Sequence, residues 1–230
     1  MKTMFLQITT PVADTASTAL STPESVSLLD LAMAGGWAMI PLLMLSIAGV
    51  YIFVERFLAL KKASQNPESF MERIKTLVLA GDINGARKLC TQTGSPVSRM
   101  IDKGLSKLGH PLKNIEASIE NQGKIEISRL EKNLAALATV AGAAPMLGFL
   151  GTVTGMISAF MAIAQAEGSV GPKELSGGIY EAMVTTAVGL IIGLPAYIGY
   201  NYLVGKIDTL VRDMEFNSVE FIELLEEPQA

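Results

Sequence analysis

The stretch SGGIYEAMVTTAVGLIIGLPAYIGYNYLVG, residues 176–205, decides the fold that we expect for this chain. A helix needs about 20 mostly apolar residues to cross the hydrocarbon core of a bilayer. This stretch exceeds that length and carries a single charged residue before Lys206. It therefore predicts a membrane-spanning helix.

The one carboxylate of this stretch, Glu181, is followed by two hydroxyls, Thr185 and Thr186. A charged side chain at the centre of a membrane helix costs about 2.5–3.5 kcal/mol on insertion scales, so it usually faces protein or water and marks a functional site. A second interpretation stays open: if the helix begins near Ser176, Glu181 could lie at headgroup level, near the positive end of the helix dipole. Residues four apart share a helix face, so the spacing favours Thr185 over Thr186 as the neighbour of Glu181.

The composition indicates a membrane protein without enzyme chemistry. Of the 230 residues, 50% are hydrophobic and 17% are charged, whereas soluble domains have about 25% charged residues. The net charge of −4 argues against a nucleic-acid partner, which would require a clustered basic face. With only Cys90 and His110, an intramolecular disulfide, a multi-cysteine metal site and a Ser-His-Asp centre all lack support. We expect no metal and no cofactor other than a transported cation, with Cys90 packed in a helix and His110 in a turn.

Two further apolar stretches predict two more crossings. Residues 28–54 form the first, which Glu55 and Arg56 end, and residues 134–164 form the second. Proline removes a backbone donor and bends membrane helices, so we expect bends at Pro145 in the second span and Pro195 in the third. The second span also carries glycines three or four residues apart, which predict one small-residue face for close helix contact: Gly148, Gly151 and Gly155.

The remaining segments connect these crossings. Residues 1–27 form a polar segment without the apolar core of a cleaved leader. Residues 55–133 predict a helical domain, with helices over 67–79, 83–90 and 97–108 and a long helix that continues without a turn into the second span. Residues 165–175 are a short connection, so the second and third spans are antiparallel neighbours. Residues 206–230 predict an amphipathic tail with one apolar stripe: Ile207, Leu210, Met214, Phe221 and Leu225.

The distribution of basic residues predicts the orientation of the chain in the membrane. Residues 55–133 hold 14 of the 18 Lys and Arg residues. Cytoplasmic segments carry the excess of basic residues, so the middle domain and the C-terminal tail lie in the cytoplasm. The segments 1–27 and 165–175 then lie outside. With this topology, Thr152 of the second span and Glu181, Thr185 and Thr186 of the third can line one polar seam, which a route for H⁺ or Na⁺ needs.

Two motifs resemble the MotA/TolQ/ExbB proton-channel family: APMLGFLGTVTGMISAF at 144–160 and IYEAMVTTAVGLIIGLPAYIGYN at 179–201. The resemblance extends to the three-crossing layout and to the middle domain, and covers nearly the whole chain except residues 1–27. MotA-type subunits have four crossings, so this chain looks like the ExbB or TolQ branch. By motif position, Glu181 matches the pore glutamate of the family, and Thr152 and Thr186 match its two threonines. Pro145 and Pro195 match its helix prolines.

The resemblance implies an architecture and partners that spacing alone could not. Such proteins form a homopentamer in the bacterial inner membrane, whose second and third helices line a central pore. Single membrane helices of an ExbD-like partner occupy the pore, and proton flow passes work to a TonB-like protein that energises outer-membrane import. By motif position, the resemblance favours Thr186 as the threonine of the ion pathway, whereas helix spacing favours Thr185 as the neighbour of Glu181. Both stay candidates.

Two alternatives remain beside an ExbB-like energising subunit. A TolQ-like subunit, with TolR-like and TolA-like partners, would maintain the cell envelope. A non-conducting membrane scaffold would explain the glycine face and the large middle domain, but it leaves Glu181 without a role.

Overall fold

The computed structural model describes residues 35–64, 69–165 and 172–226, which are almost entirely helical. The predicted polar segment 1–27 and most of the predicted connection 165–175 lie outside these residues. The structure contains a 3₁₀ helix and seven α-helices in this part of the chain: η1 (Gly36–Ala38), α2 (Met39–Ala63), α3 (Phe70–Leu79), α4 (Ile83–Thr93), α5 (Pro96–Leu105), α6 (Leu112–Leu130), α7 (Leu134–Gln165) and α8 (Pro172–Glu226). The prediction of an all-α fold is confirmed for these described residues.

Among the residues that the structure describes, three helical stretches are long and apolar enough to cross a membrane: Gly36–Ala63, Leu112–Gln165 and Ser176–Glu226. Their apolar side chains point largely outward, as in Met146, which is 74% exposed, and Ile191, which is 69% exposed. A water-soluble protein rarely leaves apolar patches of this extent uncovered. The chain is therefore a membrane protein with three candidate spans, as predicted.

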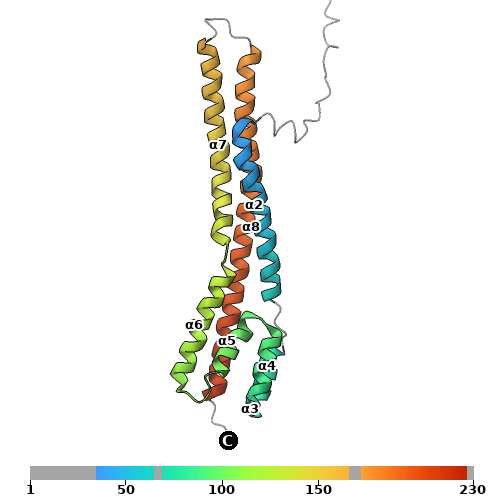
Figure 1. Ribbon diagram of the computed structural model, residues 1–230, viewed down its shortest axis with the longest axis vertical. Coiled ribbons are helices and arrows are strands. Elements are labelled where there is room, and N and C mark those ends of the chain that lie inside the picture. The colour runs from blue at the N-terminus through green and yellow to red at the C-terminus, as the bar shows by residue number, and fades with distance from the viewer. Residues whose placement is uncertain (1–34, 65–68, 166–171, 227–230) are drawn as a thin grey trace, which may run out of the picture.

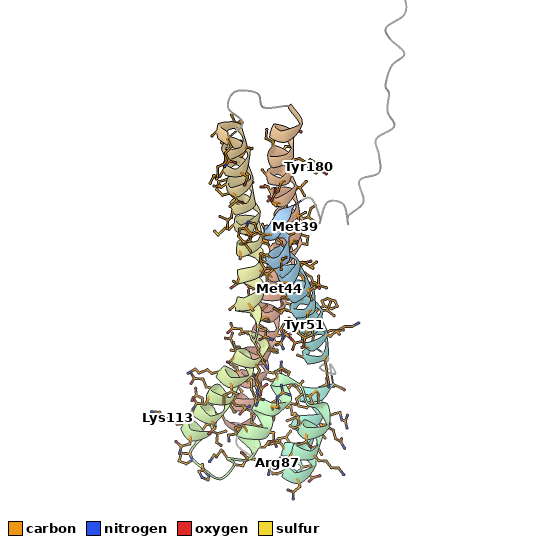
Figure 2. The ribbon with its side chains drawn as sticks, turned by 45° about the horizontal axis from the view of Figure 1, so that its top comes forward. Met39, Met44, Tyr51, Arg87, Lys113 and Tyr180 are labelled. Carbon is orange, nitrogen blue, oxygen red and sulfur yellow. The ribbon has the colours of Figure 1, made fainter. Side chains whose placement is uncertain are left out.

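The two longest helices, α7 and α8, run antiparallel and side by side, and α2 packs against both (Figure 1). Helices α5 and α6 pack against the C-terminal part of α8, with α3 and α4 beside them. Figure 2 shows charged side chains such as Arg87 and Lys113 at this end, and Met39, Met44 and Tyr51 along α2. The apolar spans thus lie along the N-terminal part of α8, and the charged helical domain lies along its C-terminal part.

Local signals place the short helices of the domain close to their predicted bounds. Asp82 caps α4 by accepting a hydrogen bond from the Gly85 amide at 2.8 Å. Gly94 ends α4 in the left-handed conformation, with φ of 63°, which glycine adopts without steric cost. Ser95 then caps α5, and Pro96 occupies its first position, where the missing N–H has no intrahelical partner to lose.

The C-terminal part of α8 completes the core of this domain. Ile207, Leu210, Met214 and Phe221 are buried, as the predicted stripe requires, and Leu225 is partly buried against the same core. Leu224, which was not predicted, is buried beside it. The ring of Phe221 is fully buried. It lies so close to α5 that a Cβ atom added at Gly104 would be 2.9 Å from its Cε1.

One predicted connection, that between the middle domain and the second span, was wrong. The predicted continuous helix into the second span is interrupted at residues 131–133. Helix α2 extends beyond the apolar run that Glu55 and Arg56 end, as far as Ala63. Asn133 has φ of 62°, a left-handed conformation that Asn tolerates better than most residues. Its side-chain amide donates to Glu55 Oε2 at 3.2 Å, so the carboxylate of α2 is bonded at the break between α6 and α7.

Candidate functional site

Helices α7 and α8 approach each other through the three predicted glycines, all of which are buried. A Cβ atom added at Gly148 would lie 2.8 Å from the carbonyl oxygen of Thr185 and 3.1 Å from Thr186 Cα. A Cβ atom at Gly155 would lie 2.9 Å from a carbonyl oxygen of α8. These neighbours are backbone atoms, which cannot rotate away, so the glycines bring the two helix backbones into direct contact.

The matching glycines on α8 were not singled out from the sequence. Cβ atoms added at Gly178, Gly189 and Gly193 would lie 2.8 Å from Ala159 Cβ, 2.6 Å from the Ala144 carbonyl oxygen and 2.5 Å from Pro145 Cγ. These three glycines share one face of α8 with Ala182, and the spacing of four and seven residues could have revealed them. Close packing thus extends along most of the α7–α8 pair.

The two prolines lie inside helices that continue through them. The ring of Pro145 fills the space left by Gly193 on α8. Pro195 lines a groove of about 300 Å³ between α2, α7 and α8, beside Gly49 and Phe53. Both prolines therefore lie where neighbouring helices pack, and the predicted bends stay predictions.

A pair of threonine hydroxyls joins α7 and α8 beside this packing. The Thr152 and Thr186 hydroxyls hydrogen-bond to each other. Thr186 also lies 3.1 Å from the Gly148 carbonyl oxygen, and Thr152 lies 3.3 Å from the Ala182 carbonyl oxygen. Each hydroxyl has one hydrogen to donate and can accept others. Either hydroxyl can therefore donate to the other, and the two can reverse these roles without any movement of α7 or α8.

Thr185, which helix geometry favoured as the neighbour of Glu181, lies in a different environment. Its side chain is fully buried, and its hydroxyl donates to the Ala182 carbonyl oxygen of its own helix at 2.9 Å. It packs over Gly151, where an added Cβ atom would lie 2.6 Å from Thr185 Cβ. The structure thus brings Thr152 and Thr186 together, whereas Thr185 is buried against Gly151.

Glu181 is half-buried on α8, five residues before Thr186. This separation amounts to about 7.5 Å along the helix axis. Helix α8 begins at Pro172, so Glu181 lies about two and a half turns into it. The influence of a helix dipole falls off within the first turn. The carboxylate lies against Gly36, at the start of η1.

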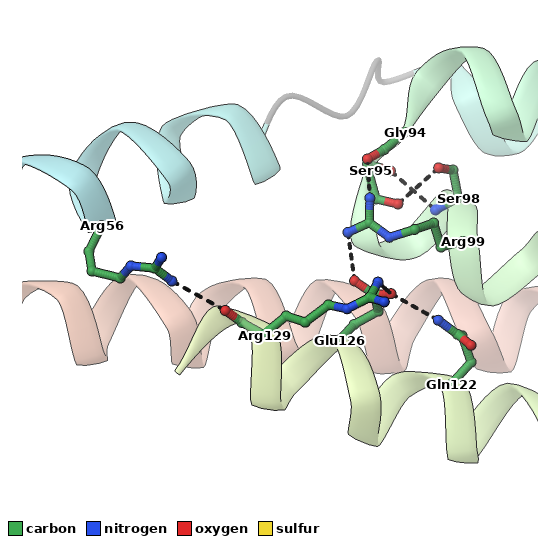
Figure 3. Close-up of polar contacts among 8 residues, drawn as sticks. All are labelled: Arg56, Gly94, Ser95, Ser98, Arg99, Gln122, Glu126 and Arg129. Atoms are coloured by element: carbon green, nitrogen blue, oxygen red, sulfur yellow. Dashed lines mark hydrogen bonds and ion pairs between the residues drawn. The ribbon is translucent and has the colours of Figure 1, made fainter. Parts of the chain in front are cut away.

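A second polar cluster joins α2, α5 and α6 below the apolar spans (Figure 3). Glu126 is fully buried and accepts hydrogen bonds from Arg99 at 2.6 Å, from Arg129 at 2.8 Å and from Gln122 at 2.9 Å. Arg56 of α2, 7% exposed, donates to the Arg129 carbonyl oxygen at 3.3 Å. Mixed charges along a helix such as α6 usually form a solvated face. Glu126 is an exception, because its carboxylate is buried while it is hydrogen-bonded to two partly exposed arginines, Arg99 and Arg129.

The lone cysteine and histidine lie where the sequence placed them. Cys90 is buried in α4, and burial raises the pKa of its thiol to about 12. His110 lies in the turn between α5 and α6. Within residues 35–64, 69–165 and 172–226, no three His, Cys, Asp or Glu side chains are grouped so that they could hold a metal ion.

Comparison with known proteins matches residues 92–216 to the model of the MotA/TolQ/ExbB proton channel family. The chain belongs to this family. The matched region contains α5, α6, α7 and most of α8, and with them Glu181, Thr152, Thr185 and Thr186. Helix α2 and η1 lie outside it.

Individual relatives within the MotA/TolQ/ExbB family carry ExbB and TolQ names. The chain is 28% identical over 199 residues to an ExbB homologue of Methanothermobacter thermautotrophicus, covering 82% of this chain and 67% of the relative. It is 40% identical over 99 residues to the biopolymer transport protein ExbB of Aquifex aeolicus, covering 42% and 66%. It is 37% identical over 100 residues to the Tol-Pal system protein TolQ of Haemophilus influenzae, covering 44% and 43%. The chain thus spans about two thirds or less of these relatives.

Proposed function

We propose that this chain is the ExbB-like subunit of an inner-membrane motor driven by the proton-motive force. The observation that carries this proposal is the pairing of a half-buried membrane carboxylate, Glu181, with the Thr152–Thr186 hydroxyl pair on adjacent apolar helices. A carboxylate can take up and release a proton, and hydroxyls can order the water that carries it. The family is one of proton channels, so H⁺ is the cation we propose.

The proposed orientation places the helical domain and the C-terminus in the cytoplasm and residues 1–27 in the periplasm. The excess of basic residues in 55–133 supports this orientation. With this orientation, Glu181 lies nearer the periplasmic end of α8 than Thr186 does. A proton from the periplasm would therefore reach the carboxylate first and the hydroxyl pair second.

The proposed partners are further copies of this chain, forming a pentamer, an ExbD-like protein with one membrane helix, and a TonB-like protein. Large exposed apolar side chains on α7 and α8 support protein or lipid neighbours along both helices: Met146, Phe149, Ile157, Phe160, Met183, Ile191, Leu194 and Ile198. Work for the TonB-like protein would come from the membrane potential. One elementary charge crossing 100 mV releases about 2.3 kcal/mol, so a few protons per step suffice for mechanical work.

A TolQ-like role in envelope integrity is the second candidate, and the match to the Haemophilus TolQ favours it. Both roles use the same carboxylate and hydroxyls. They differ in the protein that receives the work, TonB-like or TolA-like. A non-conducting scaffold, in contrast, would not need Glu181.

The test is an uptake assay that depends on energisation of the outer membrane, in cells that produce wild type or Glu181→Gln at equal levels. We expect uptake to be lost in Glu181→Gln while the complex still assembles. Glu215→Gln is the matched control, because Glu215 is an exposed carboxylate on the same helix. Wild-type uptake in Glu181→Gln, with loss of uptake on deletion of residues within 67–109, would favour the scaffold instead.

A further inference from the structure

The carboxylate of Glu181 contacts the chain at a point far away in sequence, the start of the first membrane helix. A Cβ atom added at Gly36 would collide with Glu181 Oε1, and it would lie 2.9 Å from the carboxyl carbon Cδ. Gly36 opens η1, which leads directly into α2. The carboxylate therefore lies directly against the backbone of this glycine.

Two independent features require glycine at this position. Gly36 has φ of +59°, the left-handed region that residues with a Cβ atom rarely adopt. The space that a side chain would fill is taken by Glu181. The absence of a side chain at residue 36 thus leaves the space in which the Glu181 carboxylate lies against the start of η1.

The neighbouring glycine has no such relation to Glu181. Gly35 has φ of −87°, which any residue can adopt. A Cβ atom added at Gly35 would meet Met39 Cγ at 2.5 Å and Thr185 Cγ2 at 3.4 Å. The Met39 side chain has three rotatable bonds and can move aside. Gly35 therefore provides an adjacent control for Gly36.

We propose that Gly36 is a positioning residue for Glu181, so that the start of the first membrane helix forms a third wall of the ion pathway beside α7 and α8. The proposal rests on the proposed function and extends it to a part of the chain outside the matched family region. A side chain at residue 36 would push the carboxylate away from this wall. Displacement of a reacting group by about 1 Å can lower a rate on the order of 100-fold.

The first test compares uptake in Gly36→Ala, Gly36→Asn and Gly35→Ala at equal levels of assembled complex. We expect Gly36→Ala to lower uptake about tenfold or more and Gly35→Ala to stay within about twofold of wild type. Asn tolerates left-handed backbone better than Ala. If collision with Glu181 causes the loss of uptake, Gly36→Asn lowers uptake at least as much as Gly36→Ala does. A clear recovery in Gly36→Asn would assign the defect to backbone strain and overturn the proposal.

A second readout follows the carboxylate itself and needs no transport. Hydrophobic carbodiimides modify carboxyl groups within membranes, and modification of Glu181 can be followed by mass spectrometry, with Glu181→Gln as the blank. We expect the labelling rate at Glu181 to change several-fold in both Gly36 variants and to stay at the wild-type value in Gly35→Ala. An unchanged rate in Gly36→Ala would overturn the proposal, whatever its uptake.

The two proposals fail in different ways. If Glu181→Gln takes up substrate at the wild-type level, the proposed function fails, whereas the labelling comparison still decides where the carboxylate lies. If Glu181→Gln is inactive while Gly36→Ala is fully active and labels normally, only the role of Gly36 fails.

Discussion

Replacing Glu126 by Gln tests the buried polar cluster, because the two side chains have nearly the same shape. The Glu126 carboxylate accepts three hydrogen bonds, from Arg99, Arg129 and Gln122. The amide of Gln has one oxygen, and its NH₂ group would face a donor. The substitution therefore leaves no cavity, and removes the charge and one acceptor.

The expected loss of unfolding free energy follows from how far each partner of the ion pairs is buried. Removing one partner of a buried ion pair costs about 3–5 kcal/mol. Here the side chains of Arg99 and Arg129 are 40% and 62% exposed, so water compensates part of the loss. We therefore expect Glu126→Gln to lower the free energy of unfolding by about 2 kcal/mol, which is near the cost of losing hydrogen bonds to a charged group. For a chain of this size, that lowers the melting temperature by about 4–8 °C.

The assay is thermal unfolding of the purified, detergent-solubilised protein, followed by far-UV circular dichroism at a fixed scan rate. Glu120→Gln is the matched control. Glu120 lies on the same helix, and its ion pair with Lys124, which keeps the pKa of Glu120 below its ordinary value, is exposed on both sides. We expect no measurable shift for Glu120→Gln. A melting temperature of Glu126→Gln within about 1 °C of this control would refute the reasoning from burial.

Three further outcomes are expected. Gly148→Ala would force a backbone shift of α8 and destabilise the helix pair by about 1–3 kcal/mol or more. Gly142→Ala has no atom within 4 Å of the added Cβ and, because alanine favours a helix over glycine, it would not lower the melting temperature. Thr186→Val keeps the shape of the side chain but removes the hydroxyl bonded to Thr152. We expect it to reduce proton flux into proteoliposomes while the oligomer stays intact by size-exclusion chromatography. Unchanged flux would show that the hydroxyl pair is not part of the pathway. Cys90 should resist iodoacetamide at pH 8 until the protein unfolds, because burial raises its thiol pKa to about 12 from an ordinary value near 9. Since the folded pKa is the higher one, the fold loses stability as pH rises from about 9 to 12, and rapid native alkylation would contradict this burial.

The sequence alone determined the features that depend on local spacing. Runs of apolar residues, the glycines of α7 and the caps of α4 and α5 are properties of neighbouring positions, and a helix repeats every 3.6 residues wherever it lies. These signals predicted three spans, the antiparallel α7–α8 pair and most helix bounds. The family motifs at 144–160 and 179–201 added Thr186 as a candidate beside Thr185.

The tertiary structure decided which side chains meet. Thr185 and Thr186 are about 100° apart around one helix, and only the rotation of α8 against α7 determines which of them reaches Thr152. The burial of Glu126 depends on arginines from two helices, and the contact of Glu181 with Gly36 joins residues 145 positions apart. Spacing along the chain fixes the faces of a helix. Which faces come together is fixed by the packing of helices that lie far apart in the sequence.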